Sequence, residues 1–288
     1  MTAAVLPELV PTLLGIGVLI AFATVPLLLF GVPGAWGPAV AVLRGAVQLA
    51  AISLILGGII AQPLWIAVAL VVMFAIASLV GIGRVGWSGR SALLITASIA
   101  AGVIVAGFGV FGSGALELTP RYVLAIGAII IGNTMNTASL TGRLFVGSVH
   151  DHWDQVEGWL ALGARPRRAT VHLARRAVHE ALIPTIDQTK TTGLVVLPGA
   201  FVGAIFGGLS PLEAGRFQIV VLAALIAAGA VTAVCVASGL GAVSTRPARA
   251  LTEPGRRRRA DRQSWWRGFR NGRSPRSVRG RSSRSRRS

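Results

Sequence analysis

Cysteine and lysine each occur only once in this sequence of 288 residues, as Cys235 and Lys190. A single cysteine excludes an internal disulfide. A Walker A loop needs a lysine between glycine and serine or threonine, and Lys190 follows Thr189, so the chain has no such nucleotide-binding loop. The four histidines, all within residues 150–179, do not follow a recognised zinc-ligand spacing. No resident metal site is expected, and no Ser/His/Asp or paired-carboxylate arrangement indicates an enzyme.

Charged residues are also scarce, at 13% of the chain, whereas hydrophobic residues make up 53% and the mean hydropathy is +0.69. Soluble domains contain about 25% charged residues. This composition predicts an integral protein of the cell (plasma) membrane. The chain has no lysine or arginine before Arg44, so a signal peptide with a charged start is not expected.

The net charge of +18 is concentrated at the C-terminus. Residues 246–288 contain sixteen arginines and two acidic residues, a net charge of +14, in an Arg/Ser-rich sequence of low complexity. We expect residues 1–245 to form the transmembrane domain and residues 246–288 a disordered cytoplasmic tail. Anionic lipid is the expected partner of the tail, at about 1 kcal/mol per basic residue near the surface, and no specific nucleic acid partner is expected.

Long apolar runs predict an all-α, polytopic membrane protein. About 20 residues of helix cross the hydrocarbon core of a bilayer. Seven runs meet this length, near residues 9–30, 40–60, 64–83, 92–112, 122–145, 192–209 and 217–241. The connection between the fifth and sixth, residues 147–191, is a polar insert.

Arginine and lysine predict the orientation of these spans. If the N-terminus is outside, ten basic residues before the tail fall on the inner side, and only Arg121 and Arg216 fall on the outer side. Cytoplasmic loops carry the excess of basic residues. The sequence therefore predicts an N-out, C-in topology with a cytoplasmic insert at residues 147–191.

The insert contains a short helical pattern. Asp154 and Glu157 have the spacing of an N-cap and an N3 residue, and Gly163 can end the helix. Pro166, which is tolerated in a first turn, then begins a second helical segment. From the residues alone, a surface loop and a docking element remain equally open.

Several blocks of the sequence resemble one family of transporters. Glu157 and Gly163, with five residues between them, match the first half of the signature that ABC-transporter permeases carry on a cytoplasmic coupling helix. The blocks LALGA (160–164), ALIPTIDQTKTTGLVVLPG (181–199), GAIFGGLSP (203–211) and FQI (217–219) resemble the FetB-type permeases more specifically, as do RGAVQL (44–49) and GNTMN (132–136). That family includes bacterial iron-export permeases and plant aluminium-tolerance relatives. The Ile-x-Leu-Pro end of the general ABC signature is absent here, which agrees with the FetB-type pattern.

The resemblance implies the membrane permease subunit of an ABC transporter, exporting iron or a related metal ion as a homodimer. ATP and Mg would be bound by a separate ATPase subunit, and no cofactor would belong to this chain. The resemblance implies that the ATPase subunit docks on Glu157, Trp159, Leu160, Leu162, Gly163 and Ala164. The alternative is an ATP-independent secondary transporter or ion channel.

Polar residues within the apolar runs are candidates for the substrate pathway. Arg44 and Gln48 share one face of the second span, where a structural clamp and a pathway role are both open. Asn133, Met135 and Asn136 in the fifth span must face protein or water, in substrate passage or in helix packing.

Asp187 and Lys190, three residues apart, are expected at the inner mouth of the sixth span. A gate-side ion pair and a substrate contact are both open.

Pro198 and Gly199 predict a kink or break in the sixth span, because proline cannot donate to the preceding turn. Gly199, Gly203 and Gly207 make two consecutive GxxxG steps, which let helices approach closely in lipid. Whether the partner is another span of the chain or a second copy is left open.

Overall fold

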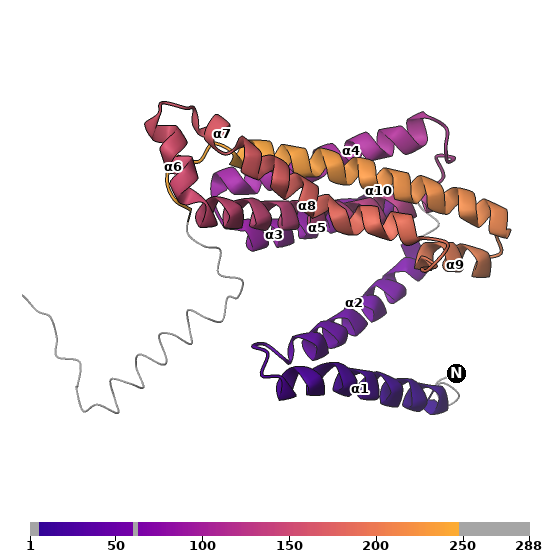
Figure 1. Cartoon of the computed structure of the whole chain (residues 1–288). Helices are drawn as coiled ribbons and strands as arrows, with labels where there is room; N and C mark the ends of the chain where they lie inside the picture. The colour runs from indigo at the N-terminus through magenta and orange to yellow at the C-terminus, as the bar shows by residue number, and fades with distance from the viewer. Residues whose placement is uncertain (1–5, 60–62, 248–288) are drawn as a thin grey trace, which may run out of the picture.

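The computed structural model describes residues 6–59 and 63–247. Ten helices form in these residues (Figure 1): α1 Leu6–Leu29, α2 Gly37–Ile59, α3 Pro63–Val85, α4 Gly89–Gly112, α5 Pro120–Asp151, α6 Trp153–Ala161, α7 Pro166–Ala169, α8 Val171–Thr191, α9 Gly199–Phe206 and α10 Pro211–Leu240. The all-α class is confirmed for the described part of the chain. The predicted tail at 246–288 lies outside these residues, apart from its first two.

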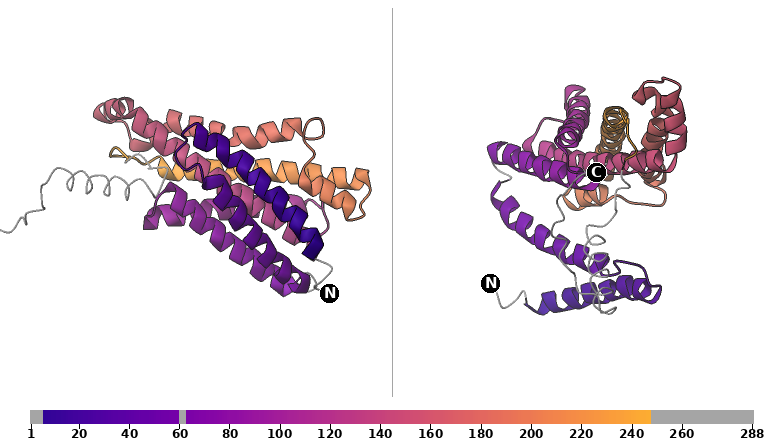
Figure 2. Two further views of the ribbon diagram at one scale, coloured as in Figure 1. Left: turned by 90° about the horizontal axis from the view of Figure 1, so that it is seen from below. Right: turned by 90° about the vertical axis from the view of Figure 1, so that its left-hand side faces the viewer.

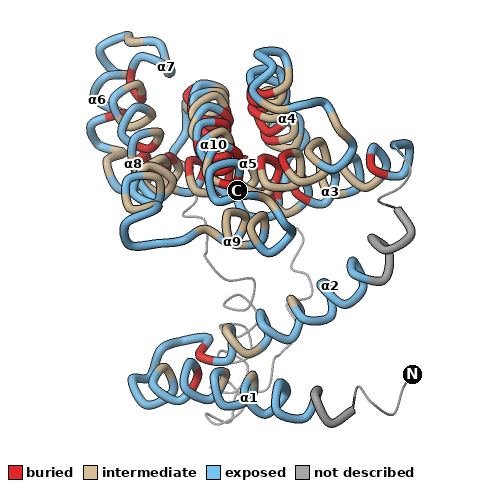
Figure 3. The backbone as a smooth tube through the Cα atoms, turned by 90° about the vertical axis from the view of Figure 1, so that its right-hand side faces the viewer, coloured by how far each residue is buried: buried red, intermediate tan, exposed pale blue. Residues whose placement is uncertain are grey.

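Helices α3, α5 and α8 lie side by side in one layer, and α4 and α10 pack over them as a second layer (Figure 3). α5 is central and contacts all four of the others. Two ends of this bundle are distinguished below. The α6 end holds α6, α7 and the last residues of α3, α5 and α10, whereas the α9 end holds α9 and the first residues of α5 and α10.

Three apolar clusters along α5 form the core. Ile126 and Ile130 pack with α4 and α10 near the α9 end, Ala138 packs at the middle, and Phe145 and Val149 pack with α8 near the α6 end. Burial between helices of similar hydrophobicity gains little from the hydrophobic effect in lipid, so close approach matters more. The helices therefore depend on small residues where they cross.

Gly102 of α4 is the clearest such position. A Cβ atom at residue 102 would overlap the Thr232 side chain of α10 and lie 2.7 Å from the carbonyl oxygen of Ala228. Only glycine allows α4 and α10 to approach this closely. The contact joins the two helices of the upper layer.

The hairpin of α1 and α2 stands apart from the bundle (Figure 2). Its turn uses Gly31 and Gly34, both with positive φ, a conformation that glycine adopts without strain. Large apolar side chains such as Leu19, Phe22 and Leu43 are exposed on its surface. An exposed apolar surface of this kind suits lipid.

Five helices have the length and apolar composition of membrane spans: Val10–Leu29 within α1, then α3, α4, α5 and α10. The apolar part of α2 reported with them is shorter, Gly37–Ser53. These six helices lie where six of the seven spans were predicted.

The predicted span at 192–209 is wrong. Residues 192–198 form a turn in which the Gly193 N–H donates to the Val196 carbonyl oxygen at 2.9 Å, and α9 has only eight residues. The break predicted at Pro198 and Gly199 is confirmed, because Pro198 is the N-cap of α9. In place of the predicted span, α8 runs along the bundle from the α6 end to the α9 end (Figure 1). Its 21 residues measure about 32 Å.

Candidate functional site

Helix α6 projects from the α6 end of the bundle. It starts at Trp153, after the N-cap residue His152, whose side chain makes no capping hydrogen bond. The predicted N-cap at Asp154 is therefore wrong, and so is the capping box that it was to form with Glu157. Asp154 instead lies in the first turn, where its carboxylate interacts favourably with the helix N-terminus.

Gly163 ends α6 as predicted. Its φ is +83°, and two backbone hydrogen bonds close the turn: Gly163 N–H to the Leu160 carbonyl oxygen at 2.9 Å, and Ala164 N–H to the Trp159 carbonyl oxygen at 3.0 Å. This pair of bonds defines a Schellman motif with glycine at the left-handed position. The motif fixes where Trp159 and Leu162 lie relative to the next segment.

The α6–α7 segment (residues 153–169) is fastened to the bundle at both ends. Val156 is buried in α6, and Trp153 packs against the cluster formed by Phe145 and its neighbours. Beyond α7, the buried Thr170 hydroxyl donates to the Gly241 carbonyl oxygen at 2.8 Å. The α6–α7 segment is therefore in contact with the ends of α5, α8 and α10.

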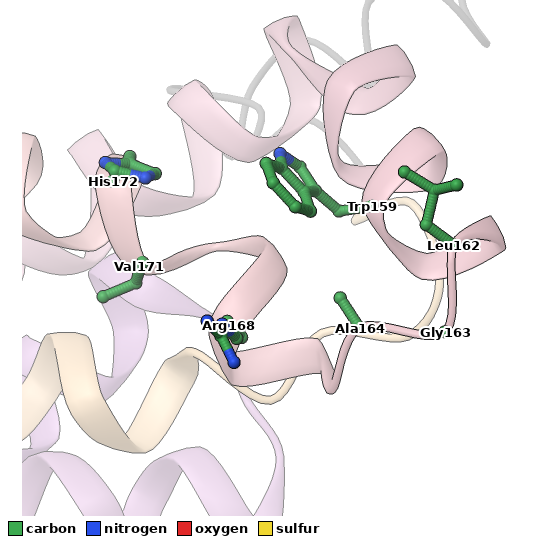
Figure 4. Close-up of a pocket in the computed structure, with 7 residues that line it drawn as sticks. All are labelled: Trp159, Leu162, Gly163, Ala164, Arg168, Val171 and His172. Carbon is green, nitrogen blue, oxygen red and sulfur yellow. The ribbon is translucent and has the colours of Figure 1, made fainter.

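A hollow of about 380 Å³ opens between α6 and the start of α8 (Figure 4). It is lined by Trp159, Leu162, Gly163, Ala164, Arg168, Val171 and His172. Trp159 is 51% exposed and Leu162 is 82% exposed. Two large apolar side chains exposed on a polar segment are typical of a protein–protein contact.

The hollow brings together four of the six predicted docking residues: Trp159, Leu162, Gly163 and Ala164. Glu157 is exposed elsewhere on α6, and Leu160 is half-buried. Sequence reasoning missed Arg168 and His172, which form the opposite wall. These two residues lie on different helices, α7 and α8, so their spacing in the sequence did not indicate a shared wall.

A second feature is the exposed face of α8, which we call the polar stripe: His172, Arg176, His179, Ile183, Asp187 and Lys190, at successive spacings of three or four residues. Arg176 Nε donates to Glu180 Oε1 at 2.7 Å, and Lys190 Nζ donates to Asp187 Oδ1 at 3.2 Å. The opposite face of α8 is apolar, with Ala177 and Ala181 buried. Sequence reasoning missed the stripe because the polar composition placed α8 in a cytoplasmic insert.

Asp187 and Lys190 lie in the last turns of α8, at the α9 end of the bundle and far from α6. The turn at 192–198 and α9 follow them directly. The span at whose mouth they were expected does not form, and α8 has already run the length of the bundle before reaching them. The two side chains do form an ion pair with each other.

The other predicted pathway residues do not converge. Asn133 Nδ2 donates to the Leu225 carbonyl oxygen of α10 at 3.1 Å, whereas Asn136 Oδ1 accepts from Arg84 Nη1 of α3 at 3.2 Å. Met135 packs against the apolar cluster around Ala138. Each therefore faces a different neighbour, because successive residues of a helix point about 100° apart.

Arg44 and Gln48 are exposed on α2, in the hairpin that stands apart from the bundle. The structure does not bring them near Asn133. The contacts of Asn133 are those of helix packing, and Arg44 and Gln48 have no contact with the polar stripe.

The glycine face of α9 is open. A Cβ atom at Gly199 or Gly203 would meet no other atom within 4 Å, and one at Gly207 would meet only α9 itself. No helix in the described part of the chain packs closely against these glycines. Among the described residues there is also no group of three or more His, Cys, Asp or Glu side chains placed to hold a metal ion.

Comparison with known proteins places this sequence in a family. The model of a family described as "Uncharacterised protein family (UPF0014)" matches residues 11–242, which include every helix from α2 to α10 and most of α1. The chain is similar to the UPF0014 membrane protein STAR2 of Oryza sativa subsp. japonica, at 36% identity over 196 residues, covering 67% of this chain and 69% of the rice protein.

Two further relatives extend the comparison. The Protein ALUMINUM SENSITIVE 3 of Arabidopsis thaliana is 35% identical over 193 residues, covering 66% of this chain and 71% of its own length. The Probable iron export permease protein FetB of Escherichia coli (strain K12) is 37% identical over 122 residues, covering 42% of this chain and 47% of the E. coli protein. No solved structure matches the chain.

Proposed function

This chain belongs to the UPF0014 family of multi-pass membrane proteins, and on that premise we propose that it is the permease subunit of an ABC transporter that exports iron or a related metal ion. ATP and Mg²⁺ bind to a separate ATPase subunit that docks on α6 and the neighbouring hollow. The E. coli relative is named as a probable iron export permease, and it supports the substrate class. Two copies of the permease and two of the ATPase complete the transporter.

The observation that carries this proposal is the α6–α7 segment. It presents the exposed Trp159 and Leu162 beside a hollow, while Val156 and Thr170 fasten it to the bundle. A docking element needs both properties, because a mobile loop would absorb the movement of the ATPase instead of transmitting it. Trp159 and Leu162 belong to the block that resembles the coupling helix, whereas Val156 and Thr170 lie outside it.

The distribution of basic residues supports an ATPase at this end. Outside α8, seven basic residues of the bundle lie at or near the α6 end, from Arg84 to Arg246, against Arg121 and Arg216 at the α9 end. The three basic residues of α8 lie along the bundle and are not counted for either end. Seven against two favours a cytoplasmic α6 end, with the N-terminus outside and the C-terminus inside.

Docking is tested with Trp159→Ala. Truncating a buried aromatic residue of an interface costs about 2 kcal/mol or more, so the Kd for the ATPase subunit should rise by roughly 30-fold. Trp87→Ala is the matched control, because Trp87 is also an exposed tryptophan, and it lies in the α3–α4 connection at the same end of the bundle. Equal losses in the two variants would show that α6 is not the docking site.

Transport is tested by reconstitution. The tagged chain is purified from its native membranes, and a co-purifying subunit with a Walker A sequence is identified by mass spectrometry. Proteoliposomes containing both are then assayed for Fe²⁺ movement with and without MgATP. A variant of the ATPase lacking the Walker A lysine should abolish transport. Movement of Fe²⁺ at the same rate without ATP would instead establish the secondary transporter or channel.

A further inference from the structure

Helix α8 has the length of a membrane span without the composition of one. Its 21 residues measure about 32 Å, close to the thickness of the hydrocarbon core. It packs against α5 and α10, both of which have the length and hydropathy of spans. Leu182 lies beside Gly229, near the middle of α10. The polar stripe therefore extends above and below the middle of the bundle.

The depth of the stripe follows from the helical rise. Relative to Leu182, His179 is displaced by about 4.5 Å toward the α6 end, and Asp187 by about 7.5 Å toward the α9 end. Arg176 and Lys190 are displaced by about 9 and 12 Å. If the bundle is centred in the bilayer, all four lie within the ~15 Å half-thickness of the hydrocarbon core.

Lipid cannot be the neighbour of this face. Charged side chains in spans face the interior of a bundle, a partner or water, because hydrocarbon offers no hydrogen bonds. Exposed faces elsewhere in the bundle fit lipid, with Leu93 and Phe108 on α4 and Ile219 and Val234 on α10. The exposed face of α8 is thus the exception among the long helices of the bundle.

The hairpin of α1 and α2 is a poor cover for the stripe. Between Val10 and Ser53 its only charged residue is Arg44, which cannot neutralise Arg176 or Lys190. The stripe and the residue beside it contain complementary charges. Glu180, beside the stripe, pairs with Arg176 four residues away, and Asp187 pairs with Lys190 three residues away, so each cation could reach the anion of a parallel copy at nearly the same depth.

We propose that the polar stripe of α8 faces the same stripe of a second copy across a two-fold axis, and that the two stripes enclose the water-filled path taken by the substrate. A two-fold interface brings the same patch of both copies together, and the ion pairs can exchange partners across it. This inference rests on the proposed function for the identity of the path as a transport route. It assigns that route to α8, away from Arg44, Gln48 and Asn133.

The interface is tested by cysteine cross-linking of the full chain in membranes. Single cysteines are introduced into a Cys235→Ala background as His179→Cys and Ile183→Cys, which lie four residues apart on the stripe. Ala181→Cys is the control on the buried face of the same helix, and Phe108→Cys is the control on an exposed apolar face. Oxidation should produce disulfide-linked dimers at 179 and 183 and not at 181 or 108.

Water in the path is tested on the same variants with a permanently charged thiol reagent. The cysteines at positions 179 and 183 should react with the reagent roughly tenfold faster, or more, than the cysteine at position 108, because a charged reagent is excluded from hydrocarbon. The absence of dimers at both stripe positions, or equal cross-linking at 108, would overturn the interface. Slow labelling at 179 and 183 would overturn the path. Neither readout requires an ATPase, so these results are independent of whether one docks on α6.

Discussion

Gly163 provides the sharpest test of how α6 is held. Its φ of +83° lies in the left-handed region, and a Cβ atom added there would meet nothing within 4 Å. Alanine at this position should therefore destabilise the turn only through the unfavourable backbone conformation, and not through a steric clash. The left-handed conformation costs a residue with a side chain about 1–2 kcal/mol.

That cost is comparable to the free energy that the hydrogen bonds of the turn contribute. Two backbone hydrogen bonds close it, each with a net contribution of about 0.5–1.5 kcal/mol. Gly163→Ala should therefore open the turn in a substantial fraction of molecules and weaken docking of the ATPase subunit by up to about tenfold, since 1.4 kcal/mol corresponds to a factor of ten. Gly163→Asn should lose less, because asparagine tolerates this conformation better.

Two measurements follow this change. Hydrogen exchange should show reduced protection of the Gly163 and Ala164 amides, and the Kd of the ATPase subunit should rise. Gly158→Ala is the matched control, because Gly158 lies inside α6 with equally open surroundings and without a positive φ. Alanine there should stabilise the helix by about 1 kcal/mol. Wild-type amide protection in Gly163→Ala, or the same loss in Gly158→Ala, would refute the reasoning.

Three other outcomes are expected. Gly102→Ala should lower the free energy of unfolding by about 1–3 kcal/mol through overpacking against α10, and with it the yield of folded protein. Gly107→Ala, on the same helix with open surroundings, should change neither. Thr170→Val should reduce the amount of substrate transported per ATP, because it removes the hydrogen bond to Gly241. Thr170→Ser keeps the hydroxyl and should keep the wild-type ratio. An equal ratio in the two variants would exclude a role of this hydrogen bond in coupling. Deleting residues 248–288 should leave transport intact, and loss of transport from correctly inserted protein would assign the tail a direct role.

Local chemistry explains where sequence reasoning succeeded. Gly163 ends α6 and Pro166 begins α7, because a left-handed turn needs glycine and a first helical turn tolerates proline. The break at Pro198 was predictable for the same kind of reason, since proline lacks the donor that a continuous helix needs. The start of α6 was not predictable from the sequence, because Asp154 can cap a helix or stabilise its first turn equally well.

Hydropathy alone misassigned residues 192–209. Residues 194–197 are all large and apolar, which made 192–209 resemble a span, although residues 192–198 form a turn and only residues 199–206 are helical. The polar sequence of α8 by itself predicts a cytoplasmic segment. A polar helix can lie along a bundle when neighbours cover its other face, and no average over its own residues reveals those neighbours.

The sequence by itself determined the membrane class, the positions of six apolar helices and the end of α6. Each depends on composition or on residues close together in the chain. Only the tertiary structure decided that α8 runs along the bundle, that Asp187 lies at the α9 end, and that Arg168 and His172 face Trp159 across a hollow. These facts depend on packing between segments distant in sequence, where the position of each helix is fixed by the shapes of its neighbours.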